Sequence, residues 1–187
     1  MKRNSFVRLT VVIACLAFFV TGCSRDPNVR KQKYYESGDR YFAKGKYREA
    51  VIEYRNATDV DATFGDAHYK LAECYLKLLD GQRAYSEYSR TVELQPDNYA
   101  ARVSLAHLLI ANGTPDSLKL AQDHVDVLIE KRPNDADTHI THAELLGKQD
   151  KFGEAIAEMQ KAATIAPQRG DIYLDLASLQ AHANLPD

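Results

Sequence analysis

The stretch YYESGDRYFAKGKYREAVIEYRNATDVDA, residues 34–62, decides the fold, because its pattern of small and aromatic residues returns along the chain. The residues that carry this pattern are Gly38, Tyr41, Ala50, Tyr54 and Ala57. A shift of 34 residues finds Ala72, Tyr75, Ala84, Tyr88 and Pro96, and a later copy has Ala143, Leu146, Ala155, Met159, Ala162 and Pro167. Self-similarity at a fixed period of this size indicates an array of repeated structural units.

Small residues recur at two positions of the repeat, as expected where two helices cross at close range. Close contact needs small side chains at the crossing, while larger side chains fill the flanks. On the first helix of each pair these residues are Gly38, Ala72, Ala106, Ala143 and Ala177, and on the second helix they are Ala50, Ala84, Ala121 and Ala155. The two rows predict an all-α fold, a superhelix of four helix-turn-helix repeats plus the first helix of a fifth.

Helix boundaries follow from the turns and prolines between the repeats. We expect first helices near residues 31–44, 65–78, 99–112, 136–149 and 170–183, and second helices near 47–60, 81–95, 116–132 and 151–165. The corresponding repeats are residues 31–64, 65–98, 99–135, 136–169 and a partial 170–187. The spacing from Pro96 to Pro133 is 37 residues instead of 34. We therefore expect three extra residues around 114–116, as an inserted turn between the helices of the third pair.

These residues resemble the tetratricopeptide repeat (TPR) family, and the resemblance covers roughly residues 31–187. It implies a TPR superhelix, an α-solenoid whose concave face is lined by the first helices and binds segments of other proteins. One departure is consistent along the chain. The tryptophan of the family's first helix is replaced by Tyr34, His68, Arg102, His139 and Tyr173.

The register of the family also implies which side chains line the concave groove. The candidate partner-binding residues are Tyr35, Asp39, Phe42, Asp66, Tyr69, Glu73, His107, Ile140 and Glu144. The lysine, arginine and asparagine residues that clamp a peptide carboxylate in some members are absent from these positions. We therefore expect a protein or peptide partner that is apolar with basic character. The alternative is that the aromatic residues pack within the array and the charges form a solvated face.

Residues 1–22 differ from the rest of the chain and are typical of a signal peptide. A basic start is followed by the apolar run Leu9–Val20, which is shorter than the roughly 20 residues that span a bilayer. The run ends in Val20-Thr21-Gly22-Cys23, which resembles the bacterial lipobox. That resemblance implies cleavage before Cys23 and lipidation of Cys23 by several acyl chains, which anchor a protein stably, with residues 23–30 as a polar tether. The alternative is an ordinary secretory peptide that is cut at a nearby small residue.

The residue after Cys23 is Ser24 rather than aspartate, and in Gram-negative lipoproteins this implies passage to the outer membrane. We therefore expect a lipid-anchored protein of the bacterial cell envelope that faces the periplasm. Without residues 1–22 the net charge is about −5, which argues against nucleic acid as a partner because nucleic-acid binding favours a basic surface. Cys74 then remains alone, and we expect it to be a buried apolar residue.

No motif for catalysis or cofactor binding is found in the sequence. It has no Gly-rich phosphate loop, no nucleophile elbow and no CxxC pair. His139 and His142 could share a helix face, but a zinc site needs three or four ligands, and a short histidine pair is a weak signal. We therefore expect no enzyme, no cofactor and no metal site.

Three functions remain open at this point. We favour a lipid-anchored TPR scaffold for protein–protein interaction, in the assembly or secretion of envelope, pilus or exopolysaccharide components. The second is the N-terminal part of a longer TPR protein, because no partner helix follows the one expected near residues 170–183. The third is a metal-binding or catalytic envelope protein.

Overall fold

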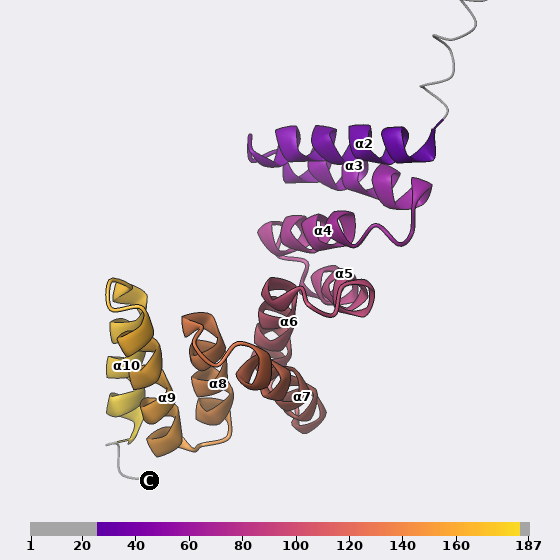
Figure 1. The fold of residues 1–187 in the computed structure, drawn as a ribbon. Coiled ribbons are helices and arrows are strands. Elements are labelled where there is room, and N and C mark those ends of the chain that lie inside the picture. The colour runs from indigo at the N-terminus through magenta and orange to yellow at the C-terminus, as the bar shows by residue number, and fades with distance from the viewer. Residues whose placement is uncertain (1–25, 184–187) are drawn as a thin grey trace, which may run out of the picture. The chain divides into compact units, whose positions relative to one another are not determined.

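The computed structural model describes residues 26–183, and every regular element in this range is an α-helix. The chain divides into two compact units, Met1–Asp80 and Gly81–Asp187. We call the described part of the first, residues 26–80, unit 1 and that of the second, residues 81–183, unit 2. Consecutive helices within each unit pack on one another (Figure 1).

Unit 1 contains α2 (Pro27–Phe42), α3 (Tyr47–Val60) and α4 (Gly65–Lys77). Helices α2 and α3 lie side by side in Figure 1, and their close approach depends on Gly38. A Cβ atom at Gly38 would lie 2.5–2.8 Å from three ring carbons of Tyr54, which is fully buried. Glycine at this position therefore lets an aromatic ring of α3 rest directly on the backbone of α2.

Unit 2 contains the remaining described helices. They are α5 (Gly81–Leu94), α6 (Tyr99–Asn112), α7 (Pro115–Lys131), α8 (Ala136–Lys148), α9 (Phe152–Ile165) and α10 (Gly170–Ala183). One apolar core joins α8, α9 and α10, in which Ala143 and Ala155 are fully buried beside Met159 and Ile172. The predicted helix ranges for α6 and α10 are confirmed to the residue.

The predicted rows of small residues are buried, with one exception. Ala72, Ala106 and Ala143 on the first helices and all four alanines on the second helices have no exposed surface, and Gly38 is also buried. Ala177 on α10 is exposed. No helix follows α10 within residues 26–183, so the small residue at this position has no second helix to cross there.

Two predictions about local structure were wrong. Helix α2 begins at Pro27 rather than near residue 31, because Asp26 accepts a 2.8 Å bond from the backbone N–H of Asn28 and proline suits the first helical turn. The three extra residues of the third repeat form helix rather than an inserted turn. Helix α7 has 17 residues where α3, α5 and α9 have 14. Thr114 caps the extra first turn through the backbone N–H of Ser117.

The turn after each of four first helices contains one residue with a left-handed backbone. These residues are Gly45, Leu79, Gly113 and Asp150, with φ of 69°, 60°, 70° and 60°. Glycine adopts this conformation without strain, whereas a bulky side chain does not. Leu79 is also 94% exposed, so packing of its side chain does not compensate for the strain.

No helix between residues 26 and 183 has both the length and the apolar character needed to cross a membrane. The predicted signal peptide, residues 1–22, and the lipidation site at Cys23 lie outside the described residues. Cys74 is a buried free cysteine, as expected. Burial raises the pKa of its thiol to about 12, so the thiolate is scarce at neutral pH.

Candidate functional site

The predicted aromatic anchor Tyr35 of unit 1 is engaged with other side chains of the same unit. Its ring centroid lies 5.6 Å from that of Tyr54 and 5.1 Å from that of Phe64, both in tilted arrangements. Burial, and then the negative charge of Asp39 and other nearby acids, raises the pKa of Tyr35 to about 12. Tyr35 therefore contributes to the packing of unit 1, as the alternative interpretation of the sequence held.

Asp39 is likewise committed to the interior of unit 1. Its Oδ1 accepts a 2.7 Å hydrogen bond from the hydroxyl of Tyr54. Burial of that hydroxyl, together with the bond to Asp39, raises the pKa of Tyr54 far above its ordinary value. The carboxylate thus satisfies a polar group that would otherwise be buried without a partner.

Lys70 on α4 contacts three further predicted groove residues of unit 1, namely Phe42, Tyr69 and Glu73. Its Nζ lies 2.6 Å from Oε2 of Glu73, 5.2 Å from the ring centroid of Phe42 and 5.8 Å from that of Tyr69. Burial would lower the pKa of Lys70, but the bond and charge of Glu73, with a further contribution from Asp39, raise it overall. The cation therefore has both carboxylate and aromatic partners within its own unit.

In unit 2 the first helices border an open hollow instead. Its volume is about 840 Å³, within the range of roughly 300–1,000 Å³ found for ligand sites. Two of the predicted groove residues, His107 and Glu144, lie on its wall. The complete lining is His107, Ile110, Ala111, Glu144, Gly147, Lys148, Asp150, Phe152, Ser178, Leu179 and His182. Helices α6, α8 and α10 supply most of these side chains.

His107 lies in contact with both Thr141 and Glu144. The hydroxyl of Thr141 donates to the backbone oxygen of Asp137 at 2.7 Å, so it accepts from Nε2 of His107 at 2.9 Å. The other ring nitrogen of His107, Nδ1, then faces Oε2 of Glu144 at 3.4 Å.

Glu144 is held in an unfavourable setting for a carboxylate. Burial raises the pKa of Glu144, the charge of Asp175 raises it further, and His107 opposes both effects. Ile140 on α8, another of the predicted partner-binding residues, is only 6% exposed and belongs to the core of unit 2. Its assignment to the groove surface was wrong, because the side chain packs inward against α9 and α10 residues rather than toward solvent.

A smaller hollow of about 180 Å³ adjoins the larger one in unit 2. The two share the wall formed by Glu144, Ser178 and Leu179. Met159, which is 1% exposed, and Asp175 complete the lining of the smaller hollow. Sequence analysis did not identify this feature, because it combines residues of α8, α9 and α10.

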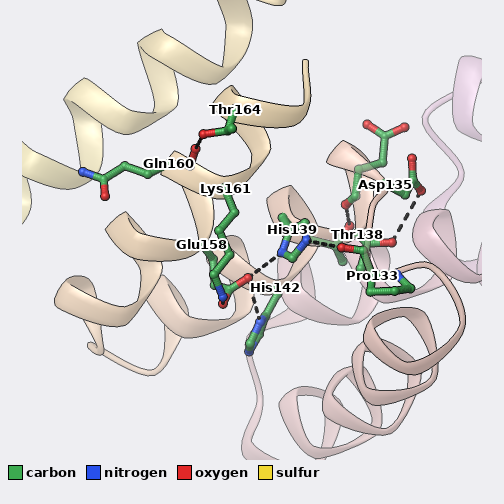
Figure 2. Close-up of polar contacts among 11 residues, drawn as sticks. Pro133, Asp135, Thr138, His139, His142, Glu158, Gln160, Lys161 and Thr164 are labelled. Carbon is green, nitrogen blue, oxygen red and sulfur yellow. Dashed lines mark hydrogen bonds and ion pairs between the residues drawn. The ribbon is translucent and has the colours of Figure 1, made fainter. Parts of the chain in front are cut away.

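His139 and His142 converge on one carboxylate rather than on a metal site. Figure 2 shows both rings directed at Glu158, with Nδ1 of His139 at 2.7 Å and Nδ1 of His142 at 3.4 Å from its Oε2. Lys161 contacts the other oxygen at 2.7 Å. Burial would raise the pKa of Glu158, but the bonds from Lys161 and His139 lower it overall. Among residues 26–183, no three His, Cys, Asp or Glu side chains are grouped so as to hold a metal ion.

Family comparison detects repeats in both units. Residues 38–78 match the model described as TPR repeat, and residues 136–169 match the model described as Tetratricopeptide repeat. Tetratricopeptide repeats are therefore detected over these two ranges of the chain. The matched residues include the Gly38 crossing of unit 1 and the His139–Glu158 contacts of unit 2.

The curated relatives of these repeats are considerably longer proteins. DnaJ homolog subfamily C member 3 of Bos taurus is 25% identical over 151 residues, which are 81% of this chain and 29% of that protein. The protein of the same name from Gallus gallus is 27% identical over 161 residues, 83% of this chain and 30% of the relative. The chain therefore spans less than a third of the length of these relatives.

Solved TPR structures match most of the chain. MamA 41-end from Desulfovibrio magneticus RS-1 has a TM-score of 0.73 at 18% identity, covering 83% of this chain and 86% of its own. TTC0263, a thermophilic TPR protein of Thermus thermophilus, has a TM-score of 0.67 at 19% identity, and the match covers 82% of this chain and 83% of that protein's chain. YrrB has a TM-score of 0.67 at 24% identity, and the match covers 96% of this chain and 87% of the YrrB chain. At these identities the likeness establishes the fold, an all-α solenoid of TPR type.

The residues that replace the family's tryptophan form a second regular feature of the TPR array. Four of them bond to the backbone oxygen six residues earlier, within the preceding loop. These contacts are His68 Nε2 to Ala62 (3.2 Å), Arg102 Nη2 to Pro96 (3.1 Å), His139 Nε2 to Pro133 (2.9 Å) and Tyr173 Oη to Pro167 (3.3 Å). The sequence signal is a hydrogen-bond donor six residues after the loop residue in each repeat. In these four repeats, a polar side chain at the position of the family's tryptophan ties the first helix to the loop before it.

Proposed function

We propose that this chain is a lipid-anchored TPR scaffold that binds a protein or peptide segment at the bacterial cell envelope. The open hollow of unit 2 carries the proposal. It has the size of a binding site and is bordered by three first helices. The packed face of unit 1, in contrast, presents side chains that already contact one another. Partner binding is therefore assigned to unit 2.

The lining of the hollow supports an extended segment as the occupant. Ile110, Leu179 and Phe152 offer apolar contact, while Glu144 and Lys148 offer charged groups for orientation. Among the structural neighbours, YrrB is described as a TPR protein with an unusual peptide-binding site. A peptide partner is consistent with both features.

Affinity capture from detergent-solubilised bacterial envelopes tests this function. The exposed Ala111 lines the hollow, so an Ala111→Trp variant fills the space without entering the core. Ala100 is exposed on the same helix and lies outside the lining, so Ala100→Trp is the matched control. We expect the first variant to lose the captured protein and the second to retain it. Equal capture by both variants would contradict the assignment to this hollow.

The lipid anchor is a separate part of the proposal and rests on the sequence Val20-Thr21-Gly22-Cys23. Its test is the mass of the mature N-terminus and the distribution of the protein between membrane and soluble fractions. Cys23→Ser should abolish acylation and release the protein, whereas Cys74→Ser, at the buried cysteine, should not. Sucrose-gradient separation of the two membranes then distinguishes our expected outer-membrane location from an inner-membrane one.

A further inference from the structure

We propose that the smaller hollow of unit 2 receives one basic side chain, lysine or arginine, of the bound segment, and holds its cation between Glu144 and Asp175. This inference rests on the proposed function, since it specifies what the partner presents. It concerns a pocket on α8, α9 and α10 that adjoins the larger hollow.

The size and lining of the hollow fit a single long side chain. Its volume of about 180 Å³ is below the roughly 300–1,000 Å³ of sites that hold whole ligands. The buried Met159 and the partly buried Leu179 provide apolar surface, and the two carboxylates provide charge. Lysine and arginine combine an apolar stem with a cationic end in the same way.

The electrostatics of the pocket lack a cation. Within residues 26–183, neither Glu144 nor Asp175 forms an ion pair with a lysine or arginine, and the contact of Glu144 is with His107. Burial raises the pKa of Glu144, His107 opposes this effect, and the negative charge of Asp175 adds to it. A cation from a partner would offset this negative charge.

Unit 1 shows what the chain does when it supplies the cation itself. Counted by the repeat spacing, Asp39 and Glu144 occupy the same position of the repeat, and Lys70 and Asp175 occupy the matching position of the next repeat. Lys70 pairs with Glu73 and is also stabilised by Asp39. Where unit 1 has this internal lysine, unit 2 has an aspartate. The missing positive charge is the one that we assign to the partner.

Retention of blocked nonapeptides on the immobilised full chain, kept in detergent, tests the inference. Eight positions carry a random mixture of Ala, Leu, Val and Ser, and the central position is arginine, lysine or citrulline, which has nearly the shape of arginine without its charge. We expect the arginine and lysine pools to be retained about tenfold more than the citrulline pool, because charge-assisted hydrogen bonds form only with the cations.

Asp175→Lys is the decisive variant, since it gives unit 2 the internal cation that Lys70 gives unit 1. It should remove the preference for the basic pools, and Glu144→Gln should reduce it. Asp171→Lys makes the same change of charge on α10 at an exposed residue outside the pocket, and it should leave the preference intact.

The possible failures separate the two proposals. Equal retention of the arginine and citrulline pools, or an unchanged preference in Asp175→Lys, overturns the basic-side-chain pocket while peptide binding by the chain stands. Retention of none of the pools by the wild-type chain overturns the pocket and also speaks against the peptide-binding function.

Discussion

The first helices of unit 1 and unit 2 place different chemistry at equivalent positions. In unit 1, Lys70 contacts Glu73 and lies over the rings of Phe42 and Tyr69, so the charges and aromatic surfaces are mutually satisfied. In unit 2 the position of Lys70 is occupied by Asp175, and the neighbouring Glu144 borders two hollows. The side chains at these positions therefore contact one another in unit 1, whereas in unit 2 Glu144 and Asp175 line a hollow.

This difference separates stability from binding. The contacts of Lys70 and Asp39 in unit 1 lower the free energy of the folded chain. The carboxylate pair of unit 2 opposes folding slightly, because Glu144 is partly desolvated beside a like charge. Unfavourable electrostatics of this kind often mark functional sites. Mutations that exchange the properties of the two units test this interpretation.

The largest effect is expected where unit 1 is most tightly packed. Gly38→Ala places a Cβ atom 2.5 Å from the ring of Tyr54, which is buried and bonded to Asp39. We expect the free energy of unfolding to fall by about 2–3 kcal/mol, as in other overpacked cores. Urea unfolding followed by circular dichroism measures the change.

Gly153 in α9 of unit 2 is the matched control for this substitution. A Cβ atom placed on its backbone would have no neighbouring atom within 4 Å, and alanine has a higher helix propensity than glycine. Gly153→Ala should therefore leave stability unchanged or raise it by up to about 1 kcal/mol. Similar losses for both variants would mean that the crossing at Gly38 is not the reason for the effect.

Removing the charge of two glutamates of unit 2 should change the stability of the chain in opposite directions. Glu158 is bound by His139 and Lys161 at 2.7 Å each, so Glu158→Gln should cost about 2 kcal/mol at pH 7. Glu144→Gln removes a charge that is disfavoured in the fold and should stabilise the chain by about 0.5 kcal/mol. Thermal unfolding of both variants and the wild type shows whether the first variant is less stable and the second more stable than the wild type.

The pH dependence of these effects also differs between the two glutamates. The pKa of Glu158 is lowered from 4.5 in the folded state, so its stabilisation is complete above pH 4.5 and is lost as the pH falls through the lower folded value. The pKa of Glu144 is raised, so its unfavourable effect is present above the folded value and absent below pH 4.5. Glu144→Gln should therefore match the wild type at pH 4. A stabilisation that persists there would show a cause other than charge.

Replacing Lys70, the internal cation of unit 1, by aspartate should give unit 1 the kind of carboxylate repulsion that unit 2 has between Glu144 and Asp175. Lys70→Asp leaves three acidic groups together, with Asp39 and Glu73, and removes the cation over Phe42. We expect a loss of about 1–2 kcal/mol at low salt that shrinks at high salt, because the repulsion is screened. Lys70→Met retains most of the apolar stem and should lose less. Urea midpoints at two salt concentrations distinguish charge from packing.

The sequence predicted the helices better than it predicted the site. The period of small residues and prolines located α6 and α10 to the residue, because each position has the same packing role in every repeat. Register alone could not show that Ile140 packs into the core or that Tyr35 rests on Tyr54. Those outcomes depend on which side chains meet from neighbouring helices, and the period does not contain that information.

Two further features of the structure were not predicted from the sequence, for equally local reasons. The 37-residue interval indicated an insertion near Thr114 but not its conformation. The inserted residues are helical because Thr114 caps α7 and Pro115 suits its first turn. The smaller hollow is lined by Asp175, which stands at the position of the repeat where unit 1 has Lys70. Such a change stands out only when the equivalent contacts of two repeats are compared in space.

The smallest expected effect concerns the turns that follow the first helices. Leu79 of unit 1 and Asp150 of unit 2 both have φ of 60°, where a bulky residue is strained more than aspartate, whose short polar side chain tolerates this region. Leu79→Gly should stabilise the chain by about 1 kcal/mol, and Asp150→Gly by less. Because Leu79 is 94% exposed, no core contact is lost in the exchange. If unfolding experiments show that Leu79→Gly destabilises the chain, the leucine side chain must make a stabilising contact in solution, and the packed face of unit 1 would extend to this turn.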